Sequence, residues 1–289
     1  MHRLEDDTPE RDLTTLSVTL ADATRTLAGA GVASPRVDAE LLAAHVLGIP
    51  RSRLLTAAAL TPAQARAFGD LVARRAQRVP LQHLTGSAPF YGLELAVGPG
   101  VFVPRFETEL LLEWALGQPA SVVADLCSGS GAIAVAFATH RPAAAVAAVE
   151  RSPAALSWLR RNVAEHAPGV RVAEGDIADR RVLADLDGGV DLVLCNPPYV
   201  PAAAPVDVEV AEHDPREAVF AGDDGLELMP AVARTAARLL RPGGRLGIEH
   251  DDSQGESLPA LLRASGDFDE IVDHRDLAGR PRFTTARRV

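Results

Sequence analysis

The strongest structural signal among the 289 residues lies in the stretch Val190-Asp191-Leu192-Val193-Leu194-Cys195-Asn196-Pro197-Pro198-Tyr199. Its first six residues are almost all apolar, as expected for a strand that is buried on both faces of a sheet. Two consecutive prolines cannot continue a central strand, because neither has an N–H to give to the ladder. The chain therefore leaves the sheet in a stiff turn that holds the Asn196 amide and the Tyr199 ring in place.

Apolar runs and helical patterns alternate on both sides of this stretch. Strands are predicted at residues 121–127, 145–150, 170–174, 190–195 and 245–250. Helices are predicted at residues 105–116, 132–139, 153–165, 226–240 and from 256 onward. A final antiparallel strand pair is predicted at 269–273 and 282–285. Repeated strand–helix units imply an α/β fold with a doubly wound, mostly parallel sheet.

The N-terminal part of the chain has a different pattern. Residues 1–12 are polar and are expected to fray. Apolar residues at helical spacing predict three helices at 14–30, 34–47 and 61–78, and the last is opened by Thr61 as N-cap and Pro62 at the first helical position. The expected organisation is a small helical bundle at 1–79, a β-hairpin linker at 80–97 and the α/β domain at 98–289.

Composition limits the classes of function. Apolar residues make up 47% of the chain, but no apolar run approaches the ~20 residues that cross a bilayer, and the acidic N-terminus lacks the apolar segment of a secretory signal. Two cysteines form no disulfide framework, so a cytoplasmic location is expected. The net charge of −10 argues against direct binding of nucleic acid. No membrane association and no metal site are expected, and the protein is expected to be a monomer.

A glycine-rich loop between a predicted strand and helix starts at Asp125. Gly129 and Gly131 let the backbone turn tightly and approach a ligand closely, and their spacing also fits a dinucleotide site. Glu150 ends the next strand, nineteen residues after Gly131. A carboxylate there can accept both ribose hydroxyls of a nucleotide or of S-adenosylmethionine.

Three features favour S-adenosylmethionine over a dinucleotide. Asp125 would repel a pyrophosphate but complements the cationic half of S-adenosylmethionine. Asp176 can accept a hydrogen bond from the adenine amino group, and Ile177 can cover the ring. The turn that begins at Asn196 follows strand 190–195, which is expected to lie beside the strand that contains Asp125. A dehydrogenase mechanism requires no such turn at this position. The expected cofactor residues are Asp125, Cys127, Ser128, Gly129, Ser130, Gly131, Glu150, Asp176, Ile177 and Asn196.

Several blocks together carry a resemblance to a known family. They are residues 80–86, 103–109 (Val-Pro-Arg-Phe-Glu-Thr-Glu), 125–131, Glu150, 196–199, 214–225 and 276–280. With these blocks the chain resembles, over nearly its whole length, the protein-(glutamine-N5) methyltransferases that modify peptide-chain release factors. Departures include Phe106, where the family has proline, and Cys127, where it has glycine.

The resemblance implies a class I methyltransferase with a Rossmann-like fold and S-adenosylmethionine as methyl donor. It implies release factors as partners, with the glutamine of a Gly-Gly-Gln loop as target, and a substrate-recognition role for residues 1–79. A structural cap is the alternative role for these helices. The catalytic residues would be Asn196, Pro197, Pro198 and Tyr199.

The turn suits a planar amide for a physical reason. The Asn196 side-chain oxygen and the Pro197 carbonyl can accept the two amide hydrogens, while Tyr199 stacks on the amide plane. Alternatives are a glutamine methyltransferase acting on a ribosomal protein and an adenine-N6 methyltransferase that flips a base against Tyr199. A dehydrogenase and a non-catalytic binding module are more distant alternatives.

Overall fold

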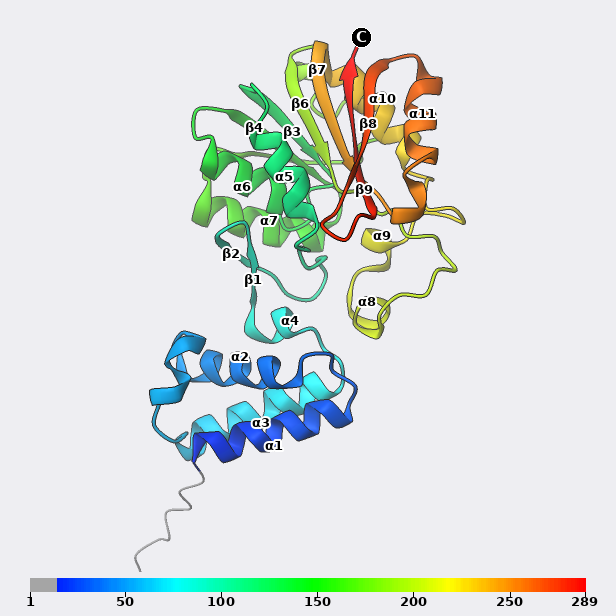
Figure 1. The fold of residues 1–289 in the computed structure, drawn as a ribbon. Coiled ribbons are helices and arrows are strands. Elements are labelled where there is room, and N and C mark those ends of the chain that lie inside the picture. Colours follow the sequence, from blue (N-terminus) through cyan, green and yellow to red (C-terminus); the bar gives the residue numbers. More distant parts are fainter. Residues whose placement is uncertain (1–14) are drawn as a thin grey trace, which may run out of the picture. The chain divides into compact units, whose positions relative to one another are not determined.

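The computed structural model describes residues 15–289, which divide into two compact units. The first ends at Thr85, and the second comprises Gly86–Val289 (Figure 1). The polar segment 1–12 and the first residue of the helix expected at 14–30 lie outside the described residues. None of the helices within residues 15–289 combines the length and apolar character that crossing a membrane requires.

The first unit is a bundle of helices. Its elements are α1 (Leu16–Gly29), α2 (Pro35–Leu47), the 3-10 helix η1 (Arg51–Thr56), α3 (Pro62–Ala76) and α4 (Leu81–Thr85). The start of α3 confirms the predicted cap: the Thr61 hydroxyl accepts from the Gln64 N–H, and the Gln64 side chain accepts from the Thr61 N–H. The apolar faces of these helices form one buried cluster, which gives this unit a core of its own.

One ion pair is buried in this bundle. Arg75 Nε on α3 donates to Asp38 Oδ2 on α2 at 2.7 Å, and both side chains are at least nine-tenths buried. Removing one member of a buried pair leaves the other charge poorly compensated. We therefore expect Asp38→Ala to lower the free energy of unfolding by about 3–5 kcal/mol, measured by chemical denaturation.

The exposed pair Arg25–Asp22 on α1 supplies the matched control. Asp22→Ala should change the free energy of unfolding by less than about 1 kcal/mol, because water screens an exposed pair. Equal effects of the two substitutions would show that the Asp38 pair does not stabilise the bundle.

The second unit begins with a hairpin, β1 (Ser87–Phe90) and β2 (Leu93–Ala96). The strands of its main sheet are β3 (Val122–Leu126), β4 (Ala145–Glu150), β5 (Arg171–Glu174), β6 (Val190–Cys195), β7 (Leu240–Glu249), β8 (Phe268–Arg275) and β9 (Pro281–Arg288). Its helices are α5 (Thr108–Leu116), α6 (Ala132–His140), α7 (Pro153–His166), α8 (Val208–His213), α9 (Arg216–Val219), α10 (Met229–Leu239) and α11 (Ser257–Ser265), with 3-10 turns η2 (Ala184–Leu186) and η3 (Asp252–Gln254).

The main sheet has seven strands in the order β5-β4-β3-β6-β7-β9-β8. Strands β3 to β7 run parallel, and β9 pairs antiparallel with both β7 and β8. This confirms the predicted α/β class and the final antiparallel pair. The chain passes from β3 to β4 on one side and returns to β6 on the other, so the sheet has a topological switch point beside β3.

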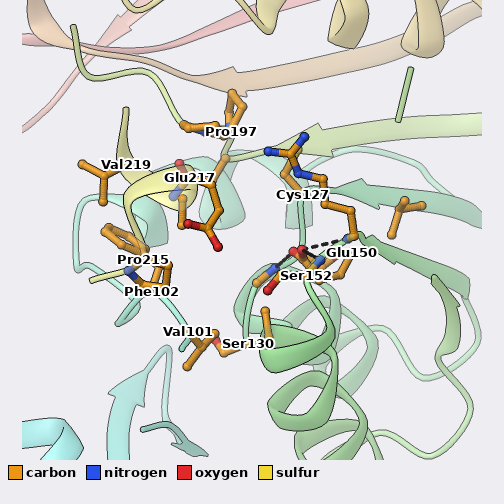
Figure 2. Close-up of a pocket in the computed structure, with 18 of the residues that line it drawn as sticks. Val101, Phe102, Cys127, Ser130, Glu150, Ser152, Pro197, Pro215, Glu217 and Val219 are labelled. Atoms are coloured by element: carbon orange, nitrogen blue, oxygen red, sulfur yellow. Dashed lines mark hydrogen bonds between the residues drawn. The ribbon is translucent and has the colours of Figure 1, made fainter. Parts of the chain in front are cut away.

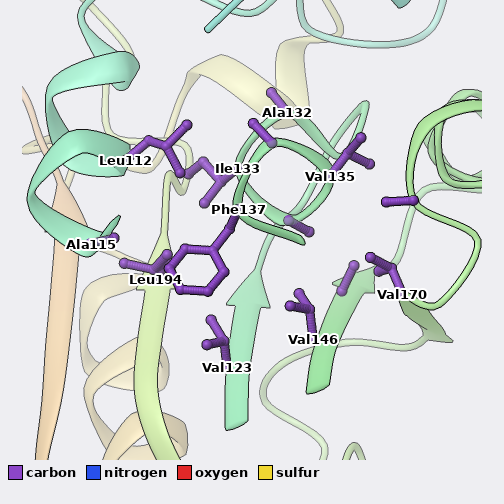
Figure 3. Close-up of a cluster of buried hydrophobic side chains, with 14 of the residues drawn as sticks. Leu112, Ala115, Val123, Ala132, Ile133, Val135, Phe137, Val146, Val170 and Leu194 are labelled. Atoms are coloured by element: carbon purple, nitrogen blue, oxygen red, sulfur yellow. The ribbon is translucent and has the colours of Figure 1, made fainter. Parts of the chain in front are cut away.

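Alternating residues of the parallel strands pack into two hydrophobic cores, one on each face of the sheet. Val123, Val146 and Leu194 face the cluster that contains residues of α5, α6 and α7 (Figure 3). Their neighbours Ala124 and Val193 belong to the cluster built with α10 and α11. Because both faces are covered, these strands read as continuous apolar runs in the sequence.

Four segments differ from the sequence prediction. Residues 81–85, at the start of the predicted β-hairpin linker 80–97, form the short helix α4, in which the Leu84 N–H donates to the Pro80 carbonyl. Helix α5 begins only at Thr108, after a turn in which the Thr108 N–H bonds the Arg105 carbonyl. Strand β7 begins at Leu240, which pairs with Val190 across a bulge. The short helices α8 and α9 occupy a segment for which no element was predicted.

Candidate active site

The site lies where β3 and β6 end together. These strands are parallel neighbours, and Leu126 stands opposite Cys195 in the ladder. The loop that begins at Cys127 and the turn that begins at Asn196 therefore leave the sheet at the same edge. This confirms the predicted neighbourhood of the two strands and places both segments on one cavity.

Every predicted site residue except Gly131 lines this cavity. Gly131 precedes α6 with a φ of 85°, and a Cβ there would stand 2.5 Å from Leu159 Cδ1. A side chain at 131 would therefore disturb the packing of α6 against α7, which explains glycine at this position. Gly129, with a φ of 56°, does line the cavity.

Asp125 presents an unusual acceptor at this cavity. Its Oδ2 accepts from the Ala134 N–H at 3.2 Å, whereas Oδ1 has no hydrogen-bond partner among residues 15–289. Burial raises the pKa of this carboxyl to about 7, with a smaller contribution from the nearby Glu150 charge. A buried acceptor without a partner is a ready site for a cationic or N–H group of a ligand.

Glu150 is held at the end of β4 by three backbone donors. Its Oε1 accepts from the N–H groups of Arg151 at 2.8 Å and Ser152 at 2.7 Å, and its Oε2 accepts from Gly129 at 2.9 Å (Figure 2). These bonds fix the carboxylate against the glycine loop and leave lone pairs for a ligand.

Asp176 and Ile177 lie beyond the end of β5. Asp176 Oδ1 accepts from the Ala178 N–H at 2.8 Å, and its Oδ2 lies 3.4 Å from the Arg151 guanidinium. The Ile177 side chain is buried and its carbonyl accepts from the Thr235 hydroxyl. Both residues line the same cavity as Glu150.

The turn after β6 is anchored at three points. Asn196 Nδ2 donates to Thr108 Oγ1 at 3.1 Å, and the Tyr199 hydroxyl donates to Glu249 Oε1 at 2.9 Å. The Tyr199 carbonyl accepts from the Gln254 side chain at 3.0 Å. Burial raises the pKa of the Tyr199 phenol well above its usual range, so the hydroxyl stays protonated as the donor.

Sequence reasoning missed a second wall of the cavity. Figure 2 shows Glu217 and Pro215 across the cavity from Glu150 and Ser152, with Phe102 near Pro215. Thr108 also lines the cavity. The resemblance of residues 103–109 and 214–225 was a signal for these segments, but it assigned no role to their side chains.

Comparisons with known proteins agree with this arrangement. A model of the PrmC N-terminal domain matches residues 19–86, and a model of the methyltransferase small domain matches residues 93–213. A methyltransferase structure from Pyrococcus furiosus superposes with a TM-score of 0.52 at 18% identity, covering 68% of this chain and 89% of that one. The class I methyltransferase fold is therefore shown.

The names of two relatives give different substrates. A 4-amino-L-phenylalanine/4-methylamino-L-phenylalanine methyltransferase of Streptomyces pristinaespiralis is 43% identical, covering 87% of this chain and 88% of its own. A release factor glutamine methyltransferase of Mycolicibacterium smegmatis is 50% identical over 280 residues, covering 96% of this chain and 99% of its own. At this identity and coverage, the chain belongs to the release factor glutamine methyltransferase family.

Proposed function

We propose that this chain transfers a methyl group from S-adenosylmethionine to the side-chain amide nitrogen, N5, of the glutamine in the Gly-Gly-Gln motif of a peptide-chain release factor. The observation that carries the proposal is a single cavity lined by both the loop after Asp125 and the turn from Asn196 to Tyr199. The cofactor, when bound, supplies a methyl group activated by its sulfonium. Family membership supports the substrate class.

The residues present fit this cofactor. The unpartnered Oδ1 of Asp125 suits the cationic amino-acid end, and Glu150, already fixed by backbone donors, suits ribose hydroxyls. Asp176 and Ile177 would bind the adenine by accepting from its amino group and covering its ring. Gly129 adds no side chain to the loop, and a Cβ there would meet nothing within 4 Å, so the backbone stays open to a ligand.

The turn would orient the substrate amide. Since Asn196 Nδ2 is bonded to Thr108, the opposite end of that amide, Oδ1, remains to accept a substrate N–H. The Pro197 carbonyl would accept the second N–H, and Pro198 keeps this backbone rigid. With both hydrogens held, the nitrogen lone pair is directed away from the acceptors and toward the methyl donor. As the N–CH3 bond forms and the sulfur–methyl bond breaks, the nitrogen would release one of its two protons to solvent, which leaves a neutral N-methyl amide.

The experiment that tests this function offers four substrates with labelled methyl donor: a release factor, that factor with Gln→Asn in its Gly-Gly-Gln loop, free 4-amino-L-phenylalanine and a ribosomal protein. A release factor should be methylated on the glutamine of its Gly-Gly-Gln loop, as located by mass spectrometry of the peptides. The same factor with Gln→Asn in that loop and free 4-amino-L-phenylalanine should not be methylated. Label on the aromatic amine, on a ribosomal protein instead of the release factor, or equally on both release factors would overturn the proposal.

Cofactor binding should depend on pH through Asp125. The carboxyl has a pKa of about 7, and a cationic ligand favours its ionised form. Below pH 7 the Asp125 carboxyl must lose a proton before the cationic cofactor binds. Cofactor affinity should therefore rise from about pH 5.5 to 7 and level off above pH 7. Calorimetric titration measures this, and Asp125→Asn should bind weakly with no such rise. An equally steep rise in Asp125→Asn would assign the titration to another group.

The N-terminal residues 1–79 would serve substrate recognition, with a linker at 80–97 and the catalytic domain at 98–289. Comparing the full chain with a version that starts at Gly86 tests this. A raised KM for the whole release factor with an unchanged KM for a short Gly-Gly-Gln peptide supports recognition. An equal change in both KM values, or loss of folding, supports a structural cap.

A further inference from the structure

We infer that the ion pair between Arg105 and Asp214 holds the second wall of the cavity in place, so that both are positioning residues for cofactor binding. The inference rests on the proposed function, because it takes S-adenosylmethionine as the ligand of this cavity. The two residues are 109 positions apart in the sequence, and neither belongs to the cavity lining itself.

The second wall belongs to a long segment that the chain forms after the turn following β6. The base of this segment is closed by backbone pairing: the Val200 N–H donates to the Val219 carbonyl at 2.9 Å, and the Ala202 N–H donates to the Gly222 carbonyl at 2.8 Å. Residues 203–218, between these pairs, contain α8 and α9. Pairing at the base leaves the position of the middle of the segment to contacts further along it.

Arg105 makes such a contact. Its Nη2 donates to Asp214 Oδ2 at 2.7 Å, and its guanidinium carbon lies 4.8 Å from the centre of the Phe102 ring. Arg105 directly follows Pro104, and Asp214 directly precedes Pro215; both prolines line the cavity. The ion pair therefore joins two lining segments at the point where each reaches the cavity.

The burial of Asp214 makes its position depend on Arg105. The Asp214 side chain is only 1% exposed, whereas that of Arg105 is 37% exposed. Burial raises the pKa of the Asp214 carboxyl to about 6, and the Arg105 charge opposes that rise, so the carboxylate is ionised at pH 8. A buried carboxylate that loses its cation is costly. Without Arg105, we expect Asp214 to move toward water and to shift the adjoining wall.

This wall encloses the space where the cofactor would bind. Figure 2 shows Pro215 and Glu217 across the cavity from Glu150 and Ser152. A ligand whose ribose lies on Glu150 is therefore covered from the opposite side by residues that follow Asp214. Enclosure buries most of a ligand's surface and excludes water, which strengthens the electrostatic interactions inside. A displaced wall should therefore weaken cofactor binding.

The test compares Arg105→Met and Asp214→Asn with the wild type at pH 8. Without ligand, amide hydrogen exchange in peptides from residues 203–218 should become at least tenfold faster, because the segment has lost its anchor. The Kd for S-adenosylhomocysteine, measured by calorimetric titration, should rise about tenfold, or ~1.4 kcal/mol. Arg105→Lys keeps the charge and should bind within about threefold of the wild type.

Three controls separate positioning from loss of stability. Asp38→Ala breaks the buried ion pair of the helical bundle and should change neither the exchange of residues 203–218 nor the Kd. Arg245→Met removes an exposed arginine that pairs with Glu270 at 2.8 Å away from the cavity lining, and it should also bind normally. The double variant Arg105→Met with Asp214→Asn should bind no more weakly than the worse single variant, because the two residues form one contact.

Three results would overturn the inference: a wild-type Kd in Arg105→Met and Asp214→Asn, unchanged exchange of residues 203–218 in both, or losses that multiply in the double variant. If Asp214→Asn does not fold, the comparison of Met and Lys at Arg105 still decides. Failure of the proposed function looks different. The wild type itself would then bind no S-adenosylhomocysteine or would not methylate a release factor, whereas failure of this inference leaves the wild type active and the variants with its affinity.

Discussion

Asn196→Ala should lower kcat by at least about a hundredfold, and by more if the Pro197 carbonyl also loses its hydrogen bond to the substrate amide. The substitution removes an acceptor aimed at the reacting nitrogen, and loss of one preorganised hydrogen-bonding group of this kind costs about 10²–10³ in rate. Cofactor affinity should stay within about tenfold, or ~1.4 kcal/mol, because the loop after Asp125 is untouched. Single-turnover kinetics with saturating cofactor measures the effect.

The control for this variant is Asn196→Asp. It keeps an acceptor oxygen facing the cavity but replaces the donor to Thr108, so it should be more active than Asn196→Ala and less active than the wild type. Retained turnover by Asn196→Ala, in protein that unfolds at the wild-type temperature, would refute the role assigned to the amide.

Gly225→Ala should disable the enzyme from outside the cavity. Gly225 has a φ of 74°, and a Cβ there would stand 2.0 Å from the Tyr199 carbonyl oxygen and 2.5 Å from Gln254 Nε2. Gln254 Nε2 braces the turn by donating to the Tyr199 and Asp224 carbonyls, both at 3.0 Å. The new methyl group must displace this backbone, and a shift of about 1 Å at a reacting site can cost about a hundredfold in rate.

Gly188→Ala is the matched control for that prediction. Gly188 has a φ of 66°, but a Cβ there would meet nothing within 4 Å. It should cost about 1–2 kcal/mol of stability from the left-handed backbone alone and leave kcat unchanged. If Gly225→Ala and Gly188→Ala have the same kcat, the bracing of the turn has no bearing on catalysis.

Much of this architecture follows from local sequence signals. Buried parallel strands read as apolar runs, and the prolines after Cys195 can only end a strand. The glycines after Asp125 predicted the loop, and the order of the elements predicted that β3 and β6 are neighbours, which places loop and turn together.

No local sequence pattern predicted the residues that hold the turn, Thr108 and Glu249. Thr108 is 88 residues from Asn196 and Glu249 is 50 residues from Tyr199, so their contacts arise only from tertiary packing. The early start of β7 was missed for another reason: Pro242, Gly243 and Gly244 read as a turn, yet the ladder with β6 continues across them through a bulge.

Cys127 illustrates a departure that the fold tolerates. The family that the sequence resembles has glycine at this position, and the structure gives Cys127 a φ of 60°, a left-handed conformation that glycine adopts without strain. Cysteine accepts this at a cost of order 1–2 kcal/mol because the surrounding loop fixes the backbone.

A structure of the enzyme with S-adenosylhomocysteine and a Gly-Gly-Gln peptide tests the central claim most directly. The account predicts the glutamine amide nitrogen within hydrogen-bond distance of Asn196 Oδ1, with Asn196 Nδ2 still on Thr108 and the adenosine beside Glu150. A glutamine bound away from Asn196, or adenosine outside this cavity, would contradict it.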